Sequence, residues 1–581
     1  MRARGGSALW HDRRNKEDRV HYLIIGGGSA GCVLAARLTE IESNRVTLIE
    51  AGRDLTEATM APHVRTRYPG RAYIDDNNIW PDLKAYLGAS GGRSRTPRRY
   101  EQGRLLGGGS SVNAMVANRG APDDYDEWGR LGAAGWSWDE ALPYFRKLER
   151  DVDFDGPYHG KQGPIPIRRI SDARMSPLAK GVIASLKAQG YPQLPDQNGK
   201  WEDGVFVGAV AVSDKGERVP TSVAYLSDDV RRRPNLRIVT EHLAERLVFD
   251  DRAATGAVVA PYGGGASQTI DADRIIVSSG AIHSPALLMR SGVGPGATLG
   301  RLGVPIVLDK AAVGQNLMEH SSTAVSTYLP PAMRMTDLDE HHDHAILRFT
   351  SNLPDAPAGD MHAAFIGRSG WHSIGQRVGT LFIWLNKPFS RGQMAITSTD
   401  PRAEPMVDFN LLADTRDLTR LMYGFRVGAK ALLHPTMTAK AGPAFPTTYS
   451  ARVAAVAAPG LWNTVQRGAF SAMLDWAGPA RSWLINSVVT LGLDIDRFMR
   501  DDVALGDFLK AGVGGVWHAS GTLRMGAAGD PAAVTDAMGK VHGLDNLYVC
   551  DASLMPAIPR ANTNTPTIMM AEKIADAHKR G

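Results

Sequence analysis

A glycine-rich turn that joins a short apolar run to a small-residue helix pattern constrains this fold more than any other feature. Residues 21–25 are apolar, the turn Gly26-x-Gly28-x-x-Gly31 follows, and residues 32–38 continue as a helix pattern. The first glycine permits a tight turn, the second lets backbone approach a pyrophosphate, and the third lets helix pack on strand. The helix N-terminus supplies oriented N–H groups to the anion. The sequence therefore predicts a dinucleotide-binding unit here.

An acidic residue after the next apolar run adds a ribose contact to this unit. Residues 45–49 form the second expected strand, and Glu50 ends it. A carboxylate at this place accepts hydrogen bonds from a ribose diol and repels a 2′-phosphate. An ordinary glycine turn is the alternative, and the unit alone leaves the choice between NAD and FAD open.

A second glycine- and serine-rich loop, residues 103–113, favours FAD. Its backbone is suited to lie along a flat ring system, and Leu105, Leu106, Val112 and Met115 bracket it, unlike the polar residues of a flexible linker. Two glycine loops, expected one near each end of an extended ligand, favour the long FAD molecule.

Composition and charge exclude several classes of protein. The 581 residues are 43% hydrophobic and 22% charged, which is typical of a globular chain with a sizeable core. The net charge is only +5 and no block of five like charges occurs, so no nucleic acid partner is expected. No apolar run reaches the length of a membrane span. Cys32 and Cys550 are interpreted as buried thiols, which suits a cytoplasmic location.

Changes of pattern along the chain predict a discontinuous cofactor domain. Strand-like runs return at residues 236–239, 257–259 and 274–277, and again at 547–549. The expected segments are a flexible N-terminus (1–19), a cofactor-binding part (20–170, with an extended excursion over about 62–99), a substrate-domain segment (171–215), a second cofactor-binding part (216–325), a substrate-binding domain (326–514) and a third cofactor-binding part with the catalytic residues (515–581).

Several separated motifs together resemble the glucose-methanol-choline (GMC) family of FAD oxidoreductases. They are the glycine turn at 26–31, the loop at 103–113, Gly280-Ala281-x-x-Ser284-Pro285, Trp517-His518-Ala519-Ser520-Gly521-Thr522, Asp551-Ala552-Ser553 and Asn562-Thr563-Asn564-Thr565-Pro566-Thr567. Residues 100–104, 384–388 and 515–518 are most similar to bacterial 5-hydroxymethylfurfural oxidases and related aryl-alcohol oxidases. The resemblance implies an α/β fold. A discontinuous Rossmann-like FAD-binding domain would carry a substrate-binding domain of β-sheet plus helices.

The resemblance also implies site residues. It places the catalytic base at His518 and its hydrogen-bonding partner at Asn564. A base must lie within hydrogen-bond reach of the alcohol oxygen, because the hydroxyl proton is removed while hydride leaves the alcohol carbon. The implied FAD contacts are Gly26, Gly28, Ser29, Gly31, Glu50, Ala51, Trp80, Gly107, Gly108, Ser111, Asn113, Ala114, Ala244, Asp551, Ala552, Asn564, Pro566 and Thr567. The implied substrate pocket is Ala114, Phe382, Trp384 and Trp517.

Two further interpretations concern the cofactor and metals. Some relatives tether FAD through a histidine where this chain has Val112, so noncovalent FAD is expected. The run His341-His342-Asp343-His344 is interpreted as a solvated loop, since metal ligands normally have separated spacing, and no metal is expected. No acidic residue stands at the matched pocket positions.

The sequence thus predicts oxidation of primary alcohols, aryl or furanic, to aldehydes, and onward to acids through hydrated aldehydes. The expected partners are a small-molecule alcohol and O₂, with H₂O₂ as product, or another electron acceptor. Open alternatives are an FAD-dependent dehydrogenase, a lyase or photodecarboxylase of the same fold, and a non-catalytic FAD-binding protein. The sequence makes no prediction of the oligomeric state.

Overall fold

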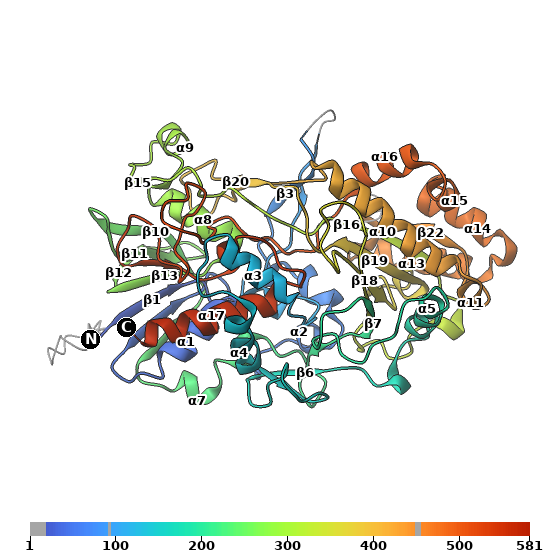
Figure 1. The fold of residues 1–581 in the computed structure, drawn as a ribbon, viewed down its shortest axis with the longest axis horizontal. Helices are drawn as coiled ribbons and strands as arrows, with labels where there is room; N and C mark the ends of the chain where they lie inside the picture. The colour runs from blue at the N-terminus through green and yellow to red at the C-terminus, as the bar shows by residue number, and fades with distance from the viewer. Residues whose placement is uncertain (1–18, 91–94, 448–454, 581) are drawn as a thin grey trace, which may run out of the picture.

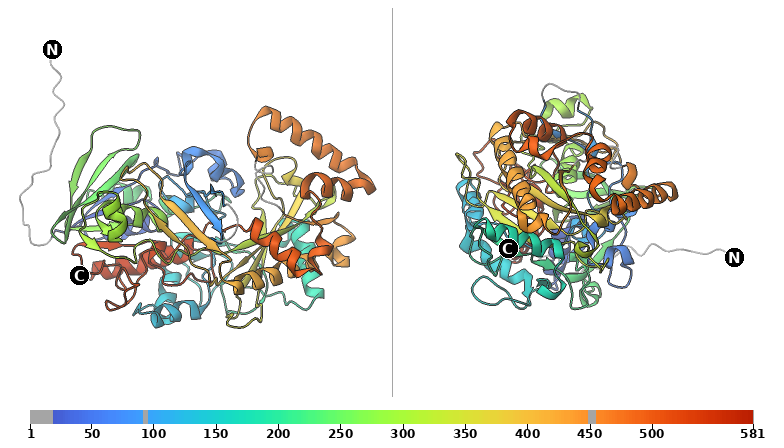
Figure 2. Two further views of the ribbon diagram at one scale, coloured as in Figure 1. Left: turned by 90° about the horizontal axis from the view of Figure 1, so that it is seen from above. Right: turned by 90° about the vertical axis from the view of Figure 1, so that its right-hand side faces the viewer.

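The computed structural model describes residues 19–90, 95–447 and 455–580, and it consists of two halves placed side by side along the long axis (Figure 1; Figure 2). One half is built on a parallel sheet and the other on an antiparallel sheet. The flexible segment expected over residues 1–19 lies, apart from Arg19, outside the described residues.

A five-stranded parallel sheet in the order β23-β13-β1-β2-β9 forms the centre of the first half. Its strands are β1 (His21–Ile25), β2 (Arg45–Ile49), β9 (Leu236–Val239), β13 (Arg274–Val277) and β23 (Leu547–Val549). These strands have the bounds expected from their apolar runs. Strand β13 pairs with β1 on one side and with β23 on the other, so both ends of the chain meet in one sheet. The three inner strands are almost wholly buried, as is typical of a parallel sheet covered on both faces.

Two helices cover one face of this sheet. Helix α1 (Ser29–Leu38) directly follows β1, and α17 (Asn564–Lys579) closes the chain; the two lie side by side in Figure 1. Arg37 of α1 and Glu572 of α17 form an ion pair at 2.7 Å, with the Glu572 side chain fully buried. Helix α4 (Trp138–Leu148) packs on the other side of α17. The amphipathic pattern of residues 567–578 predicts a closing helix, and α17 confirms it, three residues longer at its start and one at its end.

The second half is built on a six-stranded sheet in the order β22-β16-β19-β18-β17-β7. Its strands are β7 (Gly204–Val207), β16 (Ser322–Tyr328), β17 (Asp343–Phe349), β18 (Met361–Ile366), β19 (Val378–Leu385) and β22 (Ala444–Pro446). Helix α10 (Thr415–Leu433) lies on one face: a Cβ added at Gly428 would be 2.5 Å from Ile383. Since side chains alternate along a strand, Thr380, Phe382 and Trp384 point to the opposite face.

The remaining elements surround these two sheets. The helices are α2 (Pro62–Arg65), α3 (Pro122–Arg130), α5 (Pro177–Ala188), α6 (Thr221–Ala224), α7 (Asp228–Arg231), α8 (Gly280–Arg290), α9 (Gly296–Arg301), α11 (Pro435–Thr438), α13 (Leu461–Trp476), α14 (Arg481–Leu484), α15 (Ile495–Phe498) and α16 (Asp502–Gly512). The strands are β3 (Lys84–Gly88), β4 (Arg98–Arg99), β5 (Glu149–Asp151), β6 (Ile165–Arg168), β8 (Val210–Ala211), β10 (His242–Asp250), β11 (Ala253–Pro261), β12 (Gln268–Asp271), β14 (Val293–Gly294), β15 (Leu308–Asp309), β20 (Gln393–Ala395) and β21 (Met406–Leu411). None of the described helices combines the length and hydropathy needed to cross a bilayer.

One local expectation is corrected. The segment 62–99 is more than an irregular excursion, because its strand β3 pairs in parallel with β21. Paired residues of the two strands, such as Ala85 and Val407, lie more than three hundred positions apart in the sequence, so no local pattern predicts the pairing. Strand β7, from the segment 171–215, joins the sheet formed mainly by the segment 326–514. We therefore propose the six-segment division as the domain organisation.

Candidate active site

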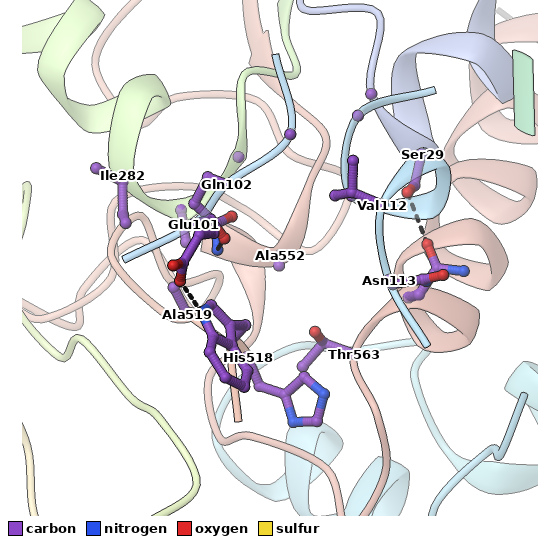
Figure 3. A pocket seen from close by; sticks show the side chains of 18 of the residues that line it. Ser29, Glu101, Gln102, Val112, Asn113, Ile282, His518, Ala519, Ala552 and Thr563 are labelled. Atoms are coloured by element: carbon purple, nitrogen blue, oxygen red, sulfur yellow. Dashed lines mark hydrogen bonds between the residues drawn. The ribbon is translucent and has the colours of Figure 1, made fainter. Parts of the chain in front are cut away.

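A cavity of about 590 Å³ extends from the parallel sheet to the six-stranded sheet. Residues after β1 and β2 line one end, including Gly28 and Glu50. Phe382 and Trp384 of β19 line the other end, together with His518. Figure 3 shows the part between them, where Val112, Asn113 and Thr563 lie between Ser29 and His518. Its volume is in the usual range of ligand pockets.

The two glycine-rich loops touch each other at the first end of this cavity. Gly107 N donates to Gly27 O at 2.7 Å, and a Cβ added at Gly108 would lie 2.8 Å from Gly28 Cα. The expectation of one loop near each end of the ligand is therefore wrong. The loops close together over one point, and the lining then continues along the cavity from Val112 to Val116.

Two helix N-termini reach the cavity at this point. Ser29 begins α1 and Asn564 begins α17, and neither helix has a described side chain as its cap. Ser29 Oγ donates to Asn564 Oδ1 at 2.7 Å, which holds the two helix starts together. Uncapped first-turn N–H groups at a helix N-terminus bind anions. This pair, beside the glycine cradle, fits the pyrophosphate of a dinucleotide.

Glu50 lies buried beside the same loops. Its Oε2 accepts from Gly27 N at 2.9 Å, and its Oε1 accepts from Gly52 N at 2.7 Å. Burial nevertheless raises the pKa of this carboxyl group. Each oxygen retains a second lone pair, so the carboxylate fits the diol of a ribose. The cavity's glycine cradle, helix termini and acid together fit FAD.

Most of the cofactor residues expected from the sequence line this cavity. They are Gly26, Gly28, Ser29, Glu50, Ala51, Trp80, Gly108, Asn113, Ala114, Ala244, Asp551, Ala552, Asn564 and Thr567. Gly31, Gly107, Ser111 and Pro566 do not line it. Gly31 instead gives close packing, since a Cβ there would lie 2.0 Å from Gly26 O, and Ser111 Oγ donates to Leu106 O at 2.9 Å.

His518 is held on both sides of its ring in the substrate end of the cavity. Its Nδ1 lies 2.8 Å from Nδ1 of His320, and its Nε2 accepts from Nδ2 of Asn562 at 3.2 Å. The side chain is only 7% exposed, and burial holds the pKa of His518 well below its ordinary value, with His320 lowering it further. Burial also lowers the pKa of His320, to about 3. Both imidazoles are therefore neutral at neutral pH.

The structure pairs His518 with Asn562, two residues before the expected Asn564. Asn564 lines the cavity near α1 instead, with its amide oxygen occupied by Ser29. Asn562 N donates to Asn118 Oδ1 at 2.8 Å, which fixes the backbone ahead of α17. The sequence reasoning missed Asn562 although it stands in the same motif, because only the point where α17 begins decides which asparagine reaches His518.

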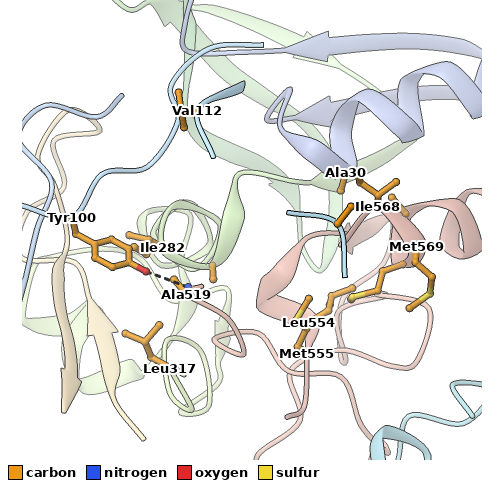
Figure 4. Close-up of a cluster of buried hydrophobic side chains, with 14 of the residues drawn as sticks. Ala30, Tyr100, Val112, Ile282, Leu317, Ala519, Leu554, Met555, Ile568 and Met569 are labelled. Carbon is orange, nitrogen blue, oxygen red and sulfur yellow. Dashed lines mark hydrogen bonds between the residues drawn. The ribbon is translucent and has the colours of Figure 1, made fainter. Parts of the chain in front are cut away.

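A buried carboxyl group holds the backbone around His518. Glu319 Oε2 accepts from His518 N at 2.8 Å and from the hydroxyl of Tyr100. The same hydroxyl accepts from Ala519 N at 3.2 Å (Figure 4). Burial raises the pKa of Glu319 to about 7. Neither residue was a candidate site residue: Glu319 stands in no motif, and the motif at residues 100–104 does not show that Tyr100 contacts Glu319.

All four expected substrate-pocket residues line the cavity. Phe382 and Trp384 project from β19 with ring centroids 5.7 Å apart, and Ala114 lies in the loop after Asn113. Trp517 is half exposed, stacks on Tyr73 and donates from Nε1 to Glu101 Oε2 at 2.8 Å. Trp517 therefore stands at an opening of the cavity rather than deep inside it.

The histidine run 341–344 is not a solvated loop, which corrects that interpretation. His341 and His344 are buried where β17 begins. His341 Nε2 lies 2.7 Å from Ala114 O, and Ser176 N donates to His344 Nδ1 at 2.9 Å. The run is buried because it opens an inner strand of the six-stranded sheet. Asp343 also lines the cavity, so an acidic residue does face the substrate end.

Comparison with known proteins gives matches over nearly the whole chain. The GMC oxidoreductase family models match residues 20–322 and 388–571. The 5-(hydroxymethyl)furfural oxidase of Methylovorus sp. (strain MP688) is 41% identical over 96% of this chain and 98% of that protein. The oxygen-dependent choline dehydrogenase of Burkholderia vietnamiensis (strain G4 / LMG 22486) is 33% identical over 96% and 92%. The crystal structure of pyridoxine 4-oxidase from Mesorbium loti superposes with a TM-score of 0.78 at 26% identity, covering 97% and 99%.

Proposed function

Because this chain belongs to the GMC oxidoreductase family and is an FAD-dependent alcohol oxidoreductase, we propose that it oxidises aryl or furanic primary alcohols to aldehydes. The electron acceptor in this proposal is O₂, which becomes H₂O₂, and the FAD is bound noncovalently. The observation that carries the proposal is the meeting of His518 and Asn562 beside an aromatic slot in the cavity that fits FAD.

His518 is the proposed base. Bound FAD supplies the acceptor for the hydride that leaves the alcohol carbon. For His518 Nε2 to take the hydroxyl proton, the ring proton must sit on Nδ1 and point to Nδ1 of His320. His320 stays neutral, since its pKa is about 3, and so it can accept that hydrogen bond across the working pH range. His320 is thus a positioning residue that selects the reactive tautomer of His518.

Asn562 is the proposed orienting group. Its amide nitrogen lies against His518 Nε2, so it donates to the same region in which the alcohol oxygen must sit. Its amide oxygen is buried without a hydrogen-bond partner among the described residues. An alcohol oxygen beside the two side chains accepts from the Asn562 amide N–H and donates its own proton to His518 Nε2, and fixing that oxygen also fixes the carbon from which hydride leaves.

The proposed ring slot explains the preferred substrate class. Phe382 and Trp384 present two aromatic faces beside His518, and Ala114 leaves room opposite. Planar rings bind such slots through burial of apolar area and offset stacking. A hydrated aldehyde offers the same hydroxyl and hydride as an alcohol, so we propose that aldehydes are carried on to acids.

A substrate panel tests this function. Hydrogen peroxide formation is measured in air, and bleaching of the flavin absorbance is measured without oxygen, for furfuryl, benzylic, aliphatic and sugar alcohols and for choline. Furfuryl and benzylic alcohols are expected to give the highest kcat/KM. Choline or glucose as the best substrate would refute the aryl assignment. Flavin bleaching without peroxide formation in air would replace the oxidase by a dehydrogenase.

We also propose a cytoplasmic location. The support is that Cys32 and Cys550 are free thiols, both buried. Burial raises the pKa of each thiol, and unreactive buried thiols suit a reducing compartment. Localisation of a tagged protein by cell fractionation tests this.

A further inference from the structure

The cavity continues past the aromatic slot to a polar end. Three cavity-lining residues there are successive partners across the six-stranded sheet: Asp343 of β17 lies opposite Ile366 of β18, which lies opposite Thr380 of β19. Ser326 of β16 follows on the far side of Thr380, with the two hydroxyl oxygens 2.7 Å apart. These residues form one row across the sheet, so they lie at about the same distance along the strands from the catalytic residues.

The spacing of residues along a strand gives that distance. Trp384, Phe382 and Thr380 succeed each other on the cavity face of β19, and each two-residue step along a strand covers roughly 6.6 Å. The row of Thr380 and Asp343 therefore lies about one step beyond Phe382 and about two beyond Trp384. A single ring that packs on Phe382, with its reacting carbinol toward His518, directs the opposite substituent toward Asp343 and Thr380.

The carboxyl group of Asp343 is only partly paired: backbone N–H groups of Phe365 and Ala345 favour its charged form, but one of its two oxygens is left over. It is 6% exposed, it lines the cavity, and its Oδ1 has no hydrogen-bond partner among the described residues. No described Lys or Arg forms an ion pair with it. Burial raises the pKa of Asp343 to about 7. Buried polar groups are nearly always paired, so an unpaired one at a cavity wall indicates a ligand contact.

We propose that Asp343 and Thr380 form a subsite for a hydrogen-bond donor on the end of the substrate opposite its reacting carbinol. The preferred substrates are then ring diols or hydroxyl-bearing ring alcohols, rather than unsubstituted furfuryl or benzyl alcohol. This inference rests on the proposed oxidation of ring alcohols at His518. The chemistry is the same at both ends of a diol, so either hydroxymethyl group reacts while the other binds Asp343.

Three furans test the subsite. They are furfuryl alcohol, 2,5-bis(hydroxymethyl)furan, and 5-hydroxymethyl-2-furoate, whose distal carboxylate repels an ionised Asp343. The wild-type kcat/KM for the diol is divided by that for furfuryl alcohol and then halved, because the diol has two reactive ends. This diol ratio should be about ten or more, as expected for a hydrogen bond to a charged group. The furoate should be the poorest of the three at pH 8.

Two substitutions separate charge from shape. Asp343→Val should bring the diol ratio close to one. Asp343→Asn should keep part of the diol ratio and should raise kcat/KM for the furoate relative to that for furfuryl alcohol. Asp251→Asn, at an exposed hairpin turn, is the matched control and should keep the wild-type ratios. An unchanged diol ratio in Asp343→Val, with normal flavin content, would overturn the subsite. Absence of oxidation of all three furans by the wild type would instead overturn the proposed function.

A different observation, on the outer surface, supports a second inference. Helix α13 (Leu461–Trp476) turns large apolar side chains outward as well as packing Leu474 inward. Arg467, Ser471 and Leu474 form its buried side, where Leu474 packs in a cluster with Phe445 and Leu484. Its outward side carries Trp462 (70% exposed), Val465 and Trp476 (89% exposed). In Figure 2 the orange segment that includes α13 stands at the edge of the molecule. A surface helix normally turns its apolar side to the core and its polar side to solvent, so large apolar side chains that face outward together indicate an interaction surface.

The outward residues have the spacing of a helix-packing seam. Trp462, Val465, Ala469, Ala472 and Trp476 follow each other at intervals of three and four residues, the a and d positions of a heptad. Large side chains stand at both ends and small ones in the middle. Two antiparallel copies related by a two-fold axis near Ala469 place each Trp462 beside the other copy's Trp476, while the small residues let the backbones approach.

Charge and area favour a second copy over a lipid surface. None of the five seam residues is charged, whereas helices that bind anionic membranes carry Lys or Arg beside the apolar face. An uncharged face meets itself without repulsion. The exposed parts of Trp462, Trp476 and neighbouring Trp483 amount to roughly 350–550 Å². Leu461, Val465 and Met473, also exposed, bring the face near the about 800 Å² that each partner buries in a standard interface.

We infer that α13 is the two-fold interface of a homodimer. The flavin-loaded protein should show the mass of a dimer by light scattering, and Trp476→Glu should show that of a monomer. Because both native thiols are buried, Ala469→Cys should form a disulfide-linked dimer under mild oxidation, and Ile306→Cys, at an exposed apolar site elsewhere, should not. A monomeric wild type at 100 μM, or a dimer that persists in Trp476→Glu, would overturn the interface. Binding of a monomer to phosphatidylcholine–phosphatidylserine vesicles would assign the face to lipid.

Discussion

At the scale of single residues, the proposed chemistry depends on a neutral His518. Positioned bases contribute about 10²–10⁴-fold in rate, so His518→Ala should slow anaerobic flavin reduction by that factor, equivalent to roughly 3–5 kcal/mol. Stopped-flow absorbance with furfuryl alcohol measures this step. Flavin content should stay normal, since no glycine-loop contact involves His518. Near-normal flavin reduction in the loaded variant would require a different base.

The pH profile of the same variant gives a second measurement. Burial lowers the pKa of His518, so the base form is already complete at the ordinary titration range of histidine. Wild-type kcat/KM should therefore stay level on descending through pH 6.5 and fall only at lower pH. His518→Ala should lack that acid limb. A wild-type acid limb centred above pH 6.5 would contradict the neutral, desolvated imidazole.

The two asparagines of one motif should differ in what they affect. Asn562→Ala removes the amide that faces His518, so it should lower kcat more than flavin affinity. Asn564→Ala breaks the bond to Ser29 between two helix starts, so it should weaken flavin binding more than the rate of reduction of the loaded enzyme. Flavin titration and stopped-flow reduction separate the two effects. The reverse pattern would return the orienting role to Asn564.

The difference between these residues shows how far sequence reasoning reaches. The motif alone singles out His518 as the proposed base, because a tryptophan, a glycine turn and small residues surround it. It does not decide between asparagines two positions apart, since the answer depends on where α17 begins and which way its first turn faces. Asp343 and Glu319 were missed for a similar reason: their role arises from burial beside distant segments, which no local spacing reports.

At the scale of elements, β5 carries two carboxylates of a buried charge network. Glu149 and Asp151 of β5, together with Asp196, surround the imidazole of His159. Arg119 pairs with Glu149, and Arg169 pairs with Asp151. The group Glu149, Asp151 and His159 has the spacing of metal ligands, but the two arginines and a protonated His159 already balance the three carboxylates. We interpret the network as structural.

His159 should therefore stabilise the fold with a definite pH dependence. Its neighbours raise the pKa of His159 to about 10 despite burial, against 6.5 when unfolded. Between these values the folded chain holds a proton that the unfolded chain has lost, so stability falls as pH rises, by up to about 1.4 kcal/mol per pH unit. The contribution is fully present below pH 6.5 and lost by about pH 10.

His159→Gln tests this dependence by urea unfolding at a series of pH values. Removing one partner of a buried charge group costs about 3–5 kcal/mol at neutral pH. The variant should also lose the fall in stability between pH 7 and pH 9.5. Equal slopes for variant and wild type would mean that His159 is neutral in the folded protein, and a metal or water would then have to satisfy the three carboxylates.

The elements themselves divide into those that local patterns predict and those that they do not. The strands of the parallel sheet were predicted to the residue, since both faces are covered and each reads as a short continuous apolar run. Strand β3 was missed, because its partner β21 lies far along the chain. The alanine- and leucine-rich pattern of residues 480–509 predicts a helical stretch, but the structure has a series of short elements there, which Leu491 and Gly492 interrupt at positive φ.

At the scale of the whole molecule, the cofactor cavity joins segments from both ends of the chain. Gly28 follows β1, Gly108 lies in the second loop, and Asn564 begins the last helix, and all three line one cavity. The sheet beneath pairs β1 with β13, and β13 with β23. A ligand that contacts all these segments stabilises the folded chain by mass action, since the unfolded chain lacks the site.

Release of FAD tests this coupling together with the noncovalent attachment. Val112 lines the cavity where a tethering histidine would stand, and its side chain forms no bond to a flavin ring. Acid precipitation should therefore leave all flavin in the supernatant; flavin retained in a washed pellet would contradict noncovalent binding.

Apoprotein prepared under mild conditions should melt at a lower temperature than the holoprotein. Adding FAD at 100 times its Kd should restore about 2.7 kcal/mol of stability. The glycine loops and helix starts belong to distant segments, so FAD should raise the melting temperature of the whole unfolding transition together. If only part of it shifted, the two halves would unfold separately, and the cavity would then belong to the parallel-sheet half alone.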